Sequence, residues 1–318
     1  MKIEQATPEA LVEARAFNTQ LETLLSTQPS VHTVPIERAR QVRREGKGIF
    51  PPPVYLPRAR DLVIPGRSGD VRLRILAPEG APRGVYLHFH GGGWTLGAGD
   101  MQDPQLAALA DATGLVAVSV DYRLAPEHPF PAGADDCEDA ALWLVERGAS
   151  ELGAPSRLTL GGESAGAHLA ALALLRLRDG HGITGAFRAA NLVFGAFDLS
   201  MAPSARLWGD RNLVLSVPIM TFFMDNLLPG VDREARRAPT YSPLFADLRG
   251  MPPAIFTVGT LDPLLDDTLF MAARWSASGA TTELHVWPEA IHGFTGFPLA
   301  LARAATATTE RFLRAAVA

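Results

Sequence analysis

Cysteine is nearly absent from this chain of 318 residues, in which Cys137 is the single example. One cysteine excludes an internal disulfide and is typical of a reducing compartment, so we expect a cytoplasmic protein. The sequence also lacks a run of 18 apolar residues that would span a bilayer, and its first residues show no apolar stretch typical of a signal peptide. Neither sign of charge dominates: 29 basic and 34 acidic side chains give a net charge of −5. This balance excludes a global basic field that would attract nucleic acid or acidic lipid.

Apolar segments typical of buried strands alternate with helical segments through most of the chain. This alternation indicates an α/β fold with a mostly parallel sheet that is flanked by helices on both faces. Two earlier segments, 61–65 and 71–77, have the period of strands, and the strict alternation of the second predicts an antiparallel edge. We expect the other strands at 85–89, 115–120, 158–160, 191–194, 254–258 and 284–286, and the helices at 101–113, 134–147, 165–177, 264–278 and 299–316.

Two segments fall outside this alternation. In the first, residues 7–27 have helical spacing with Thr7 as a cap and Pro8 at the first position, and residues 37–47 are rich in arginine. We interpret the basic stretch as a solvated helix face or loop, with a patch for an anionic partner as the alternative. The second, residues 198–241, is long and apolar, which favours a binding element or lid over helices that only pad the core.

A serine framed by glycines, Gly162-Glu163-Ser164-Ala165-Gly166, lies between a predicted strand and a predicted helix. This is the context in which a Gly-x-Ser-x-Gly turn lifts a nucleophilic hydroxyl clear of a sheet. A serine hydroxyl is a weak nucleophile until a base takes its proton, so the motif also requires a histidine. We therefore predict Ser164 as a nucleophile, with a structural serine at a turn as the alternative.

His292 follows the last predicted strand, and Asp262 follows the strand before it. A histidine on such a loop can place one nitrogen toward the serine while a carboxylate holds the other. Asp262 could instead only cap a helix, and Asp266 and Asp267 are rivals for the acid role. We favour Asp262 because active sites of open α/β sheets gather at the carboxyl ends of strands.

Three consecutive glycines follow the predicted strand at 85–89, in the order His90-Gly91-Gly92-Gly93-Trp94. Glycines let backbone N–H groups turn toward a developing oxyanion without a Cβ in the way, although a simple glycine turn is the alternative. The residue after the nucleophile, Ala165, is expected to supply a further N–H.

Together these motifs resemble the hormone-sensitive-lipase-like, bacterial family IV branch of the α/β-hydrolases. The resemblance also rests on the stretch from Asp121 to Pro131, and it runs from about residue 50 to the end. It implies an eight-stranded sheet in a catalytic domain, 56–318, and a helical cap formed by residues 1–55 and an insertion at about 198–241. It implies a triad of Ser164, Asp262 and His292 and an oxyanion hole formed by the amides of Gly92, Gly93 and Ala165. Glu163 departs from the family, whose bacterial members usually have Asp or Thr there.

The predicted activity is that of a serine carboxylesterase that acts through an acyl-enzyme on short- to medium-chain esters. It needs no metal or organic cofactor, and its partner is a small-molecule ester, with a homodimer left open. Alternatives are a related acyl hydrolase (aryl-formamidase, lactonase or deacetylase) and a non-catalytic binding protein on the same fold. Cys137 is expected to be a core residue and not a nucleophile. The predicted substrate pocket is bulky and is formed by Trp94, Leu207, Trp208, Phe222 and Phe223.

Overall fold

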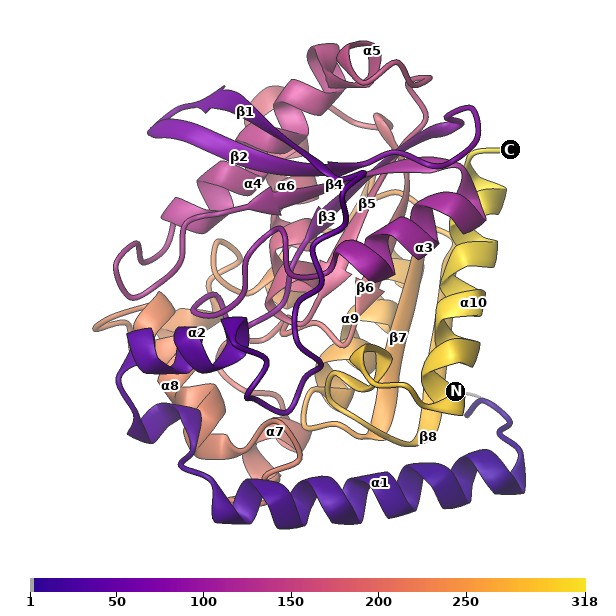
Figure 1. Cartoon of the computed structure of the whole chain (residues 1–318). Helices are drawn as coiled ribbons and strands as arrows, with labels where there is room; N and C mark the ends of the chain where they lie inside the picture. The colour runs from indigo at the N-terminus through magenta and orange to yellow at the C-terminus, as the bar shows by residue number, and fades with distance from the viewer. Residues whose placement is uncertain (1–2) are drawn as a thin grey trace.

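Parallel pairing joins six strands in the centre and on one side of a single sheet, in a computed structural model that describes residues 3–318. The strand order is β1-β2-β4-β3-β5-β6-β7-β8, and only β1 and β2 pair in antiparallel fashion, with each other and with β4 (Figure 1). The predicted α/β fold with a mostly parallel sheet is confirmed. The strands are β1 (Arg60–Gly66), β2 (Gly69–Leu76), β3 (Gly84–Phe89), β4 (Leu115–Asp121), β5 (Leu158–Glu163), β6 (Phe187–Val193), β7 (Ala254–Leu261) and β8 (Thr282–Ile291).

Helices cover both faces of the sheet because side chains of each inner strand alternate between two apolar cores. Val85, Leu87 and Phe89 of β3 face one core, and Tyr86 faces the other. The helices α4 (Ala132–Trp143), α6 (Ala165–His181) and α9 (Leu265–Ala277) pack on the first face. The helices α3 (Asp103–Thr113) and α10 (Ala300–Ala316) pack on the second (Figure 1).

Several predicted boundaries differ from the observed ones. The helix expected at 134–147 is α4, followed by a π-helical turn η2 (Leu144–Gly148) and the short α5 (Ala149–Glu151). The last strand is far longer than the expected 284–286 because it pairs with β7 along most of its length, including polar residues at its start. The edge strand on the antiparallel side of the sheet is β1. The alternating segment predicted there, 71–77, forms β2, the inner neighbour of β1.

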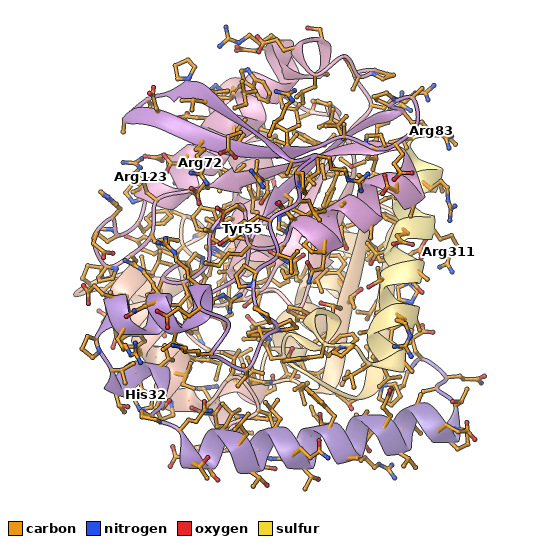
Figure 2. All side chains as sticks on the ribbon, viewed as in Figure 1. His32, Tyr55, Arg72, Arg83, Arg123 and Arg311 are labelled. Carbon is orange, nitrogen blue, oxygen red and sulfur yellow. The ribbon has the colours of Figure 1, made fainter. Side chains whose placement is uncertain are left out.

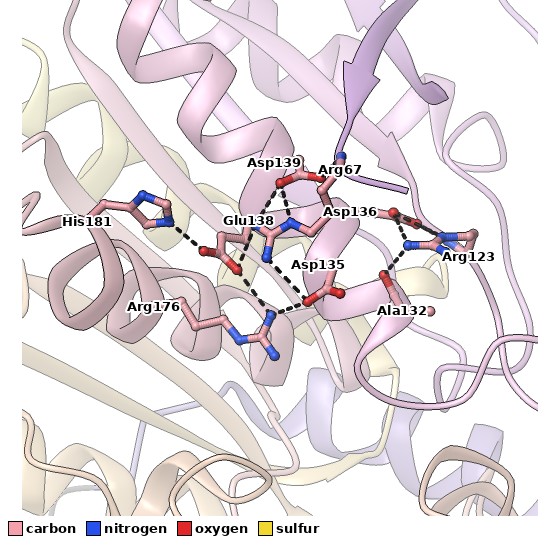
Figure 3. A network of polar contacts seen from close by, with 9 residues as sticks. All are labelled: Arg67, Arg123, Ala132, Asp135, Asp136, Glu138, Asp139, Arg176 and His181. Atoms are coloured by element: carbon pink, nitrogen blue, oxygen red, sulfur yellow. Dashed lines mark hydrogen bonds and ion pairs between the residues drawn. The ribbon is translucent and has the colours of Figure 1, made fainter. Parts of the chain in front are cut away.

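The acidic residues of α4 form a network of ion pairs that joins three parts of the fold (Figure 3). Arg67, in the turn between β1 and β2, contacts Glu138 and Asp139 at 3.0 and 2.7 Å. Arg176 of α6 contacts Asp135 and Glu138 of α4. Connected pairs with little exposure stabilise more than isolated surface pairs, so this network fixes the edge hairpin to the helical layer. The other members are Arg123, Ala132, Asp136 and His181.

Two helical segments that are far apart in the sequence, the N-terminal segment and the insertion, contact each other. The chain begins with α1 (Pro8–Thr27), where the Oγ of Thr7 accepts the Ala10 N–H as predicted, and continues through η1 (Val31–Thr33) to α2 (Ile36–Arg44). The insertion contributes α7 (Pro203–Leu207) and α8 (Val217–Leu227), and η1 packs against α8. In the view of Figure 1, α2 and α8 both lie at the lower left, and Figure 2 labels His32 of η1 in the same region.

The basic stretch is only partly the solvated face that the composition predicts. Arg40 of α2 donates to both carboxylate oxygens of Glu127 and to the carbonyls of Thr95 and Ala125. α2 is thereby fixed to the loops that follow β3 and β4. After α2 the chain passes Tyr55, in front of the sheet in the view of Figure 2, and enters β1. From residue 3 to residue 318, none of the helices combines the length and the apolar character that a membrane span requires.

Candidate active site

Three strands end at one edge of the sheet, and each is followed by one of the predicted catalytic residues. Ser164 lies between β5 and α6, Asp262 directly follows β7, and His292 directly follows β8. Ser164 has φ 56° and ψ −118°, a conformation that only a tightly supported turn maintains. The turn needs its glycines because a Cβ at Gly162 or Gly166 would collide with the carbonyl oxygen of Phe89.

The structure brings these three residues into one hydrogen-bonded line. His292 Nε2 lies 2.9 Å from Ser164 Oγ, and His292 Nδ1 lies 2.9 and 3.1 Å from the two carboxylate oxygens of Asp262. A carboxylate can only accept, so Nδ1 carries the proton and Nε2 is left to accept from the serine hydroxyl. Asp262 and His292 are buried, and the Phe194 ring lies edge-on to the imidazole with centroids 4.8 Å apart. This arrangement can deprotonate a serine hydroxyl as it attacks a carbonyl.

The two rival aspartates have other partners. Asp266 accepts the Ser204 N–H at 2.9 Å. Asp267 is fully buried and accepts the N–H groups of Phe197 and Asp198, each at 2.7 Å. Burial raises the pKa of the Asp267 carboxyl well above its usual value. Both residues therefore stabilise the loops behind the site, and neither contacts His292.

The glycine loop after β3 lies beside the nucleophile. Gly92 has φ 125° and Gly93 has φ 59°, conformations that L side chains rarely adopt. Within residues 3–318, neither of their N–H groups donates to a protein acceptor. The Ala165 N–H is in the first turn of α6, where amides have no intrahelical partner. All three residues that were predicted for an oxyanion hole thus have an N–H available to a ligand.

Two aromatic pairs support this loop from behind. The His90 ring stacks on Tyr122 with centroids 4.1 Å apart, and the Tyr122 hydroxyl donates to the His90 carbonyl at 2.7 Å. Trp94 donates its indole N–H to His168 Nδ1 at 3.1 Å. These contacts fix the backbone between residues 90 and 94, so its N–H groups are held in place before a substrate binds.

The serine faces a cavity of about 560 Å³ that is mainly apolar. Of the five predicted pocket residues, Trp94 and Phe223 line it. Leu207 does not, being 86% exposed, and Trp208 packs instead against the core near α1 with its indole N–H on the Arg211 carbonyl. Phe222 is also outside the lining and packs against the core beside Phe223. Adjacent residues of a helix point about 100° apart, so α8 presents one of the two phenylalanines to the cavity.

Sequence reasoning missed most of the apolar lining. The insertion contributes Val214, Leu215, Ile219, Met220 and Met224, and the N-terminal segment contributes Val31, Val34, Val42, Ile49 and Phe50. The helical period of 217–227 could have indicated the buried face of α8. No pattern in residues 31–50 indicates which of their side chains face a site formed more than a hundred residues later.

Glu163, the departure from the family pattern, lies beside the nucleophile and lines the cavity. Its carboxylate is 3.0 and 3.2 Å from His88 Nε2, and His88 Nδ1 is 3.0 Å from Ser119 Oγ. Burial opposes ionisation of Glu163, yet the charge and hydrogen bond of His88 and a hydrogen bond from Gln102 hold its pKa below the usual value. The Glu163 carboxylate is thus paired with His88, a side chain of β3.

Cys137, the other side chain that could act as a nucleophile, does not line the cavity. Cys137 is fully buried among apolar side chains, and burial raises the pKa of its thiol well above the usual value, as a core residue requires. Between residues 3 and 318, no three His, Cys, Asp or Glu side chains gather as metal ligands would.

Comparison with known proteins agrees with this geometry. A family model described as alpha/beta hydrolase fold matches residues 86–296. The chain is 36% identical over 299 residues to Carboxylesterase NlhH of Mycobacterium tuberculosis, which covers 91% of this chain and 92% of the relative. It is 28% identical over 236 residues to an acetyl esterase of Salmonella paratyphi B, covering 74% of this chain and 72% of that protein. The solved structure of an esterase from Pyrobaculum calidifontis superposes with a TM-score of 0.84 at 29% identity, covering 99% of this chain and all of the other.

Proposed function

The chain belongs to the α/β-hydrolase family, in its hormone-sensitive-lipase-like branch, and on that premise we propose that it is a serine carboxylesterase. The observation that supports this most strongly is the hydrogen-bonded line from Ser164 through His292 to Asp262 at the wall of an apolar cavity. The relative with 36% identity is named a carboxylesterase, which supports an ester as the substrate.

In the proposed mechanism His292 Nε2 takes the proton of Ser164 Oγ as that oxygen attacks the ester carbonyl carbon. Asp262 holds the imidazole in the required tautomer and stabilises the imidazolium that forms. The imidazolium then gives its proton to the leaving alkoxide, which departs as the alcohol and leaves an acyl-enzyme on Ser164. Water enters, His292 takes its proton, and the acyl group leaves as the carboxylic acid while Ser164 regains its proton.

The negative oxygen that forms in both steps is proposed to accept hydrogen bonds from the amides of Gly92, Gly93 and Ala165. These donors have fixed positions before the reaction, so little reorganisation is needed when charge develops. Loss of one such donor typically lowers the rate about 100- to 1000-fold. The amide at the start of α6 also contributes the positive end of a helix dipole.

We further propose that residues 1–55 and 198–241 form a cap over the catalytic domain, 56–318, and limit the acyl chain. The cavity of about 560 Å³ is bounded by the described N-terminal residues and by α8, and Met220, Phe223 and Met224 narrow it. A cavity of this size has room for short to medium acyl chains. A deacetylase is the second candidate, which the similarity to an acetyl esterase favours. The homodimer and the cytoplasmic location stay predictions.

The test is hydrolysis of 4-nitrophenyl esters from C2 to C12 by the wild type and by Ser164→Ala. We expect kcat/KM to be highest at C2 to C8 and to fall by at least about 10³-fold in the variant. A maximum at C2 alone, with aryl acetates and acetylated alcohols preferred, would favour the deacetylase. Equal rates for the two proteins would refute the proposed nucleophile.

A further inference from the structure

One half-buried cation in the wall of the cavity has no anionic partner among residues 3–318. Arg43, in the last turn of α2, lines the same cavity as Ser164 and His292 and is half-buried. Among residues 3–318 its guanidinium neither donates a hydrogen bond to a protein acceptor nor pairs with a carboxylate. Burial lowers the pKa of this guanidinium, and an arginine nevertheless keeps its charge in proteins.

The other basic residues near it differ in this respect. Arg40 of α2 is paired with Glu127 at 2.6 Å, and Lys47 is paired with Glu45 at 2.9 Å. Arg38 donates to Gln41 and is exposed. A half-buried guanidinium without a partner is unfavourable unless a ligand or water satisfies its donors. The guanidinium of Arg43 is therefore available to bind an anion in the cavity.

The surroundings of Arg43 connect it to two loops at the site. Its guanidinium carbon lies 4.8 Å from the centre of the Phe50 ring, a cation–π contact that leaves the edge donors free. Phe50 in turn lies against the loop of His292, because a Cβ on Gly293, the residue after His292, would lie 3.2 Å from the Phe50 ring. On the opposite side, burial and, to a smaller degree, the charge of Arg43 lower the pKa of His90 to about 4. Arg43 is thus linked through Phe50 to the loop of His292, and its charge acts on His90 at the start of the predicted oxyanion loop.

The charges around the cavity favour the same ligand. Three cationic residues line the cavity, Arg38, Arg43 and Lys47, against one carboxylate, that of Glu163. Glu163 is held by His88, as described above. The apolar remainder of the lining excludes water and strengthens an ion pair at Arg43. A negatively charged group on the substrate would meet a cation here and no free anion.

We propose that Arg43 binds a carboxylate carried by the substrate, so the preferred esters are anionic ones such as half-esters of dicarboxylic acids or esters of carboxylated alcohols. This inference rests on the proposed esterase function and names the substrate class of that site. Arg43 would contact the remote carboxylate bidentately, and Ser164 would attack the ester carbonyl at the other end of the same cavity. Binding energy from that remote contact would position the carbonyl at the serine.

The test compares esters that differ only in charge. On the acyl side, mono-4-nitrophenyl adipate is paired with 4-nitrophenyl 6-methylheptanoate, in which isopropyl replaces the carboxylate. On the alcohol side, 4-acetoxybenzoate is paired with 4-isopropylphenyl acetate. The readout is the ratio of kcat/KM for the anionic ester to that for the neutral one, with background hydrolysis subtracted, in the wild type and in Arg43→Met, Arg43→Lys and Arg44→Met. Arg44 is exposed, is not part of the lining and serves as the matched control.

We expect the ratio for at least one pair to fall about tenfold or more in Arg43→Met, since a charge-assisted hydrogen bond contributes that much. Arg43→Lys should retain part of the preference, Arg44→Met should retain all of it, and added salt should reduce it. An unchanged ratio for both pairs in Arg43→Met, or no turnover of either anionic ester, would overturn the proposal. If the wild type showed no Ser164-dependent hydrolysis of any neutral ester, the proposed function itself would be overturned. The two failures are therefore distinguishable.

Discussion

His168 accepts the indole N–H of Trp94 at Nδ1, 3.1 Å away, and its Nε2 lies 2.7 Å from the carbonyl oxygen of Tyr241. A carbonyl can only accept, so Nε2 carries the proton and the buried imidazole is neutral. This one side chain of α6 joins the loop that follows β3 to the end of the insertion. Its protonation would break the bond from Trp94, which supports the predicted oxyanion loop.

The buried histidines make the protein less stable as the pH falls from 6.5 toward 4. Burial lowers the pKa of both His90 and His168 to about 4, from an ordinary value near 6.5. Between these values the unfolded chain binds protons that the folded chain does not, so the free energy of unfolding decreases as the pH is lowered. Each histidine contributes a slope approaching about 1.4 kcal/mol per pH unit. Urea unfolding at pH 7, 6, 5 and 4.5 measures it.

His168→Gln is the variant that isolates this effect, since it removes one titrating group from the core. The variant should take up about one proton fewer on unfolding than the wild type does, so its free energy of unfolding should depend less steeply on pH. Carboxylates with lowered pKa, such as Glu138, lose their contribution only below about 4.5. The raised pKa of Asp267 acts in the opposite direction, but it is present in both proteins and cancels in the comparison. A slope that is the same in both proteins would contradict the assignment.

Asp262→Asn should lower kcat for 4-nitrophenyl butyrate by about 10³- to 10⁴-fold with little change in the folded structure. The amide cannot hold the imidazole in the tautomer that leaves Nε2 free to accept from Ser164. The matched control is Asp266→Asn, one helical turn away, whose carboxylate accepts only the Ser204 N–H and touches no catalytic group. Comparable losses in the two variants, with both folded, would show that the acid has been misassigned.

Gly93→Ala should reduce kcat by about 10- to 100-fold, because the loop must shift to admit the new Cβ. That atom would collide with the Phe223 ring, and the shift would move the N–H groups away from the oxyanion. Gly153→Ala is the control for backbone strain alone, since Gly153 has φ 66° but open space around its Cβ position. Full activity in Gly93→Ala would mean that this amide does not contribute to the transition state.

Arg67→Met should destabilise the protein by about 1–3 kcal/mol, measured by urea unfolding at low salt. The substitution leaves Glu138 and Asp139, whose side chains are 7% and 10% exposed, without one of their cationic partners. The exposed pair of Arg249 and Asp247 offers a comparison, and Arg249→Met should leave the free energy of unfolding essentially unchanged. Equal small effects would show that the network in Figure 3 adds nothing beyond ordinary surface pairs.

The sequence was sufficient for the fold and for the positions of Ser164, Asp262 and His292. Each follows an apolar run that forms a buried strand, and parallel strands bring their carboxyl ends to one edge. The sharp turn at Ser164 was also predictable, because the glycines at 162 and 166 are required where the turn approaches Phe89.

The pocket was predictable only in part, for a physical reason. The size of an apolar side chain does not tell which surface it faces, and three of the five predicted residues lie outside the lining, with Leu207 86% exposed. Trp208 packs toward α1, which precedes it by almost two hundred residues. Arg43 shows the reverse case: a basic residue in a stretch interpreted as solvated lines the catalytic cavity. Contacts between segments so far apart depend on the register of the whole fold.

The most direct test of the central claim is active-site labelling with a 4-nitrophenyl organophosphate, followed by intact mass and peptide mapping. The wild type should gain one phosphoryl adduct, on Ser164, as esterase activity is lost. Ser164→Ala should gain none, and His292→Ala should react far more slowly because the serine is no longer deprotonated. An adduct on another residue, or a wild type that hydrolyses esters but stays unlabelled, would contradict the assignment of Ser164 as the nucleophile.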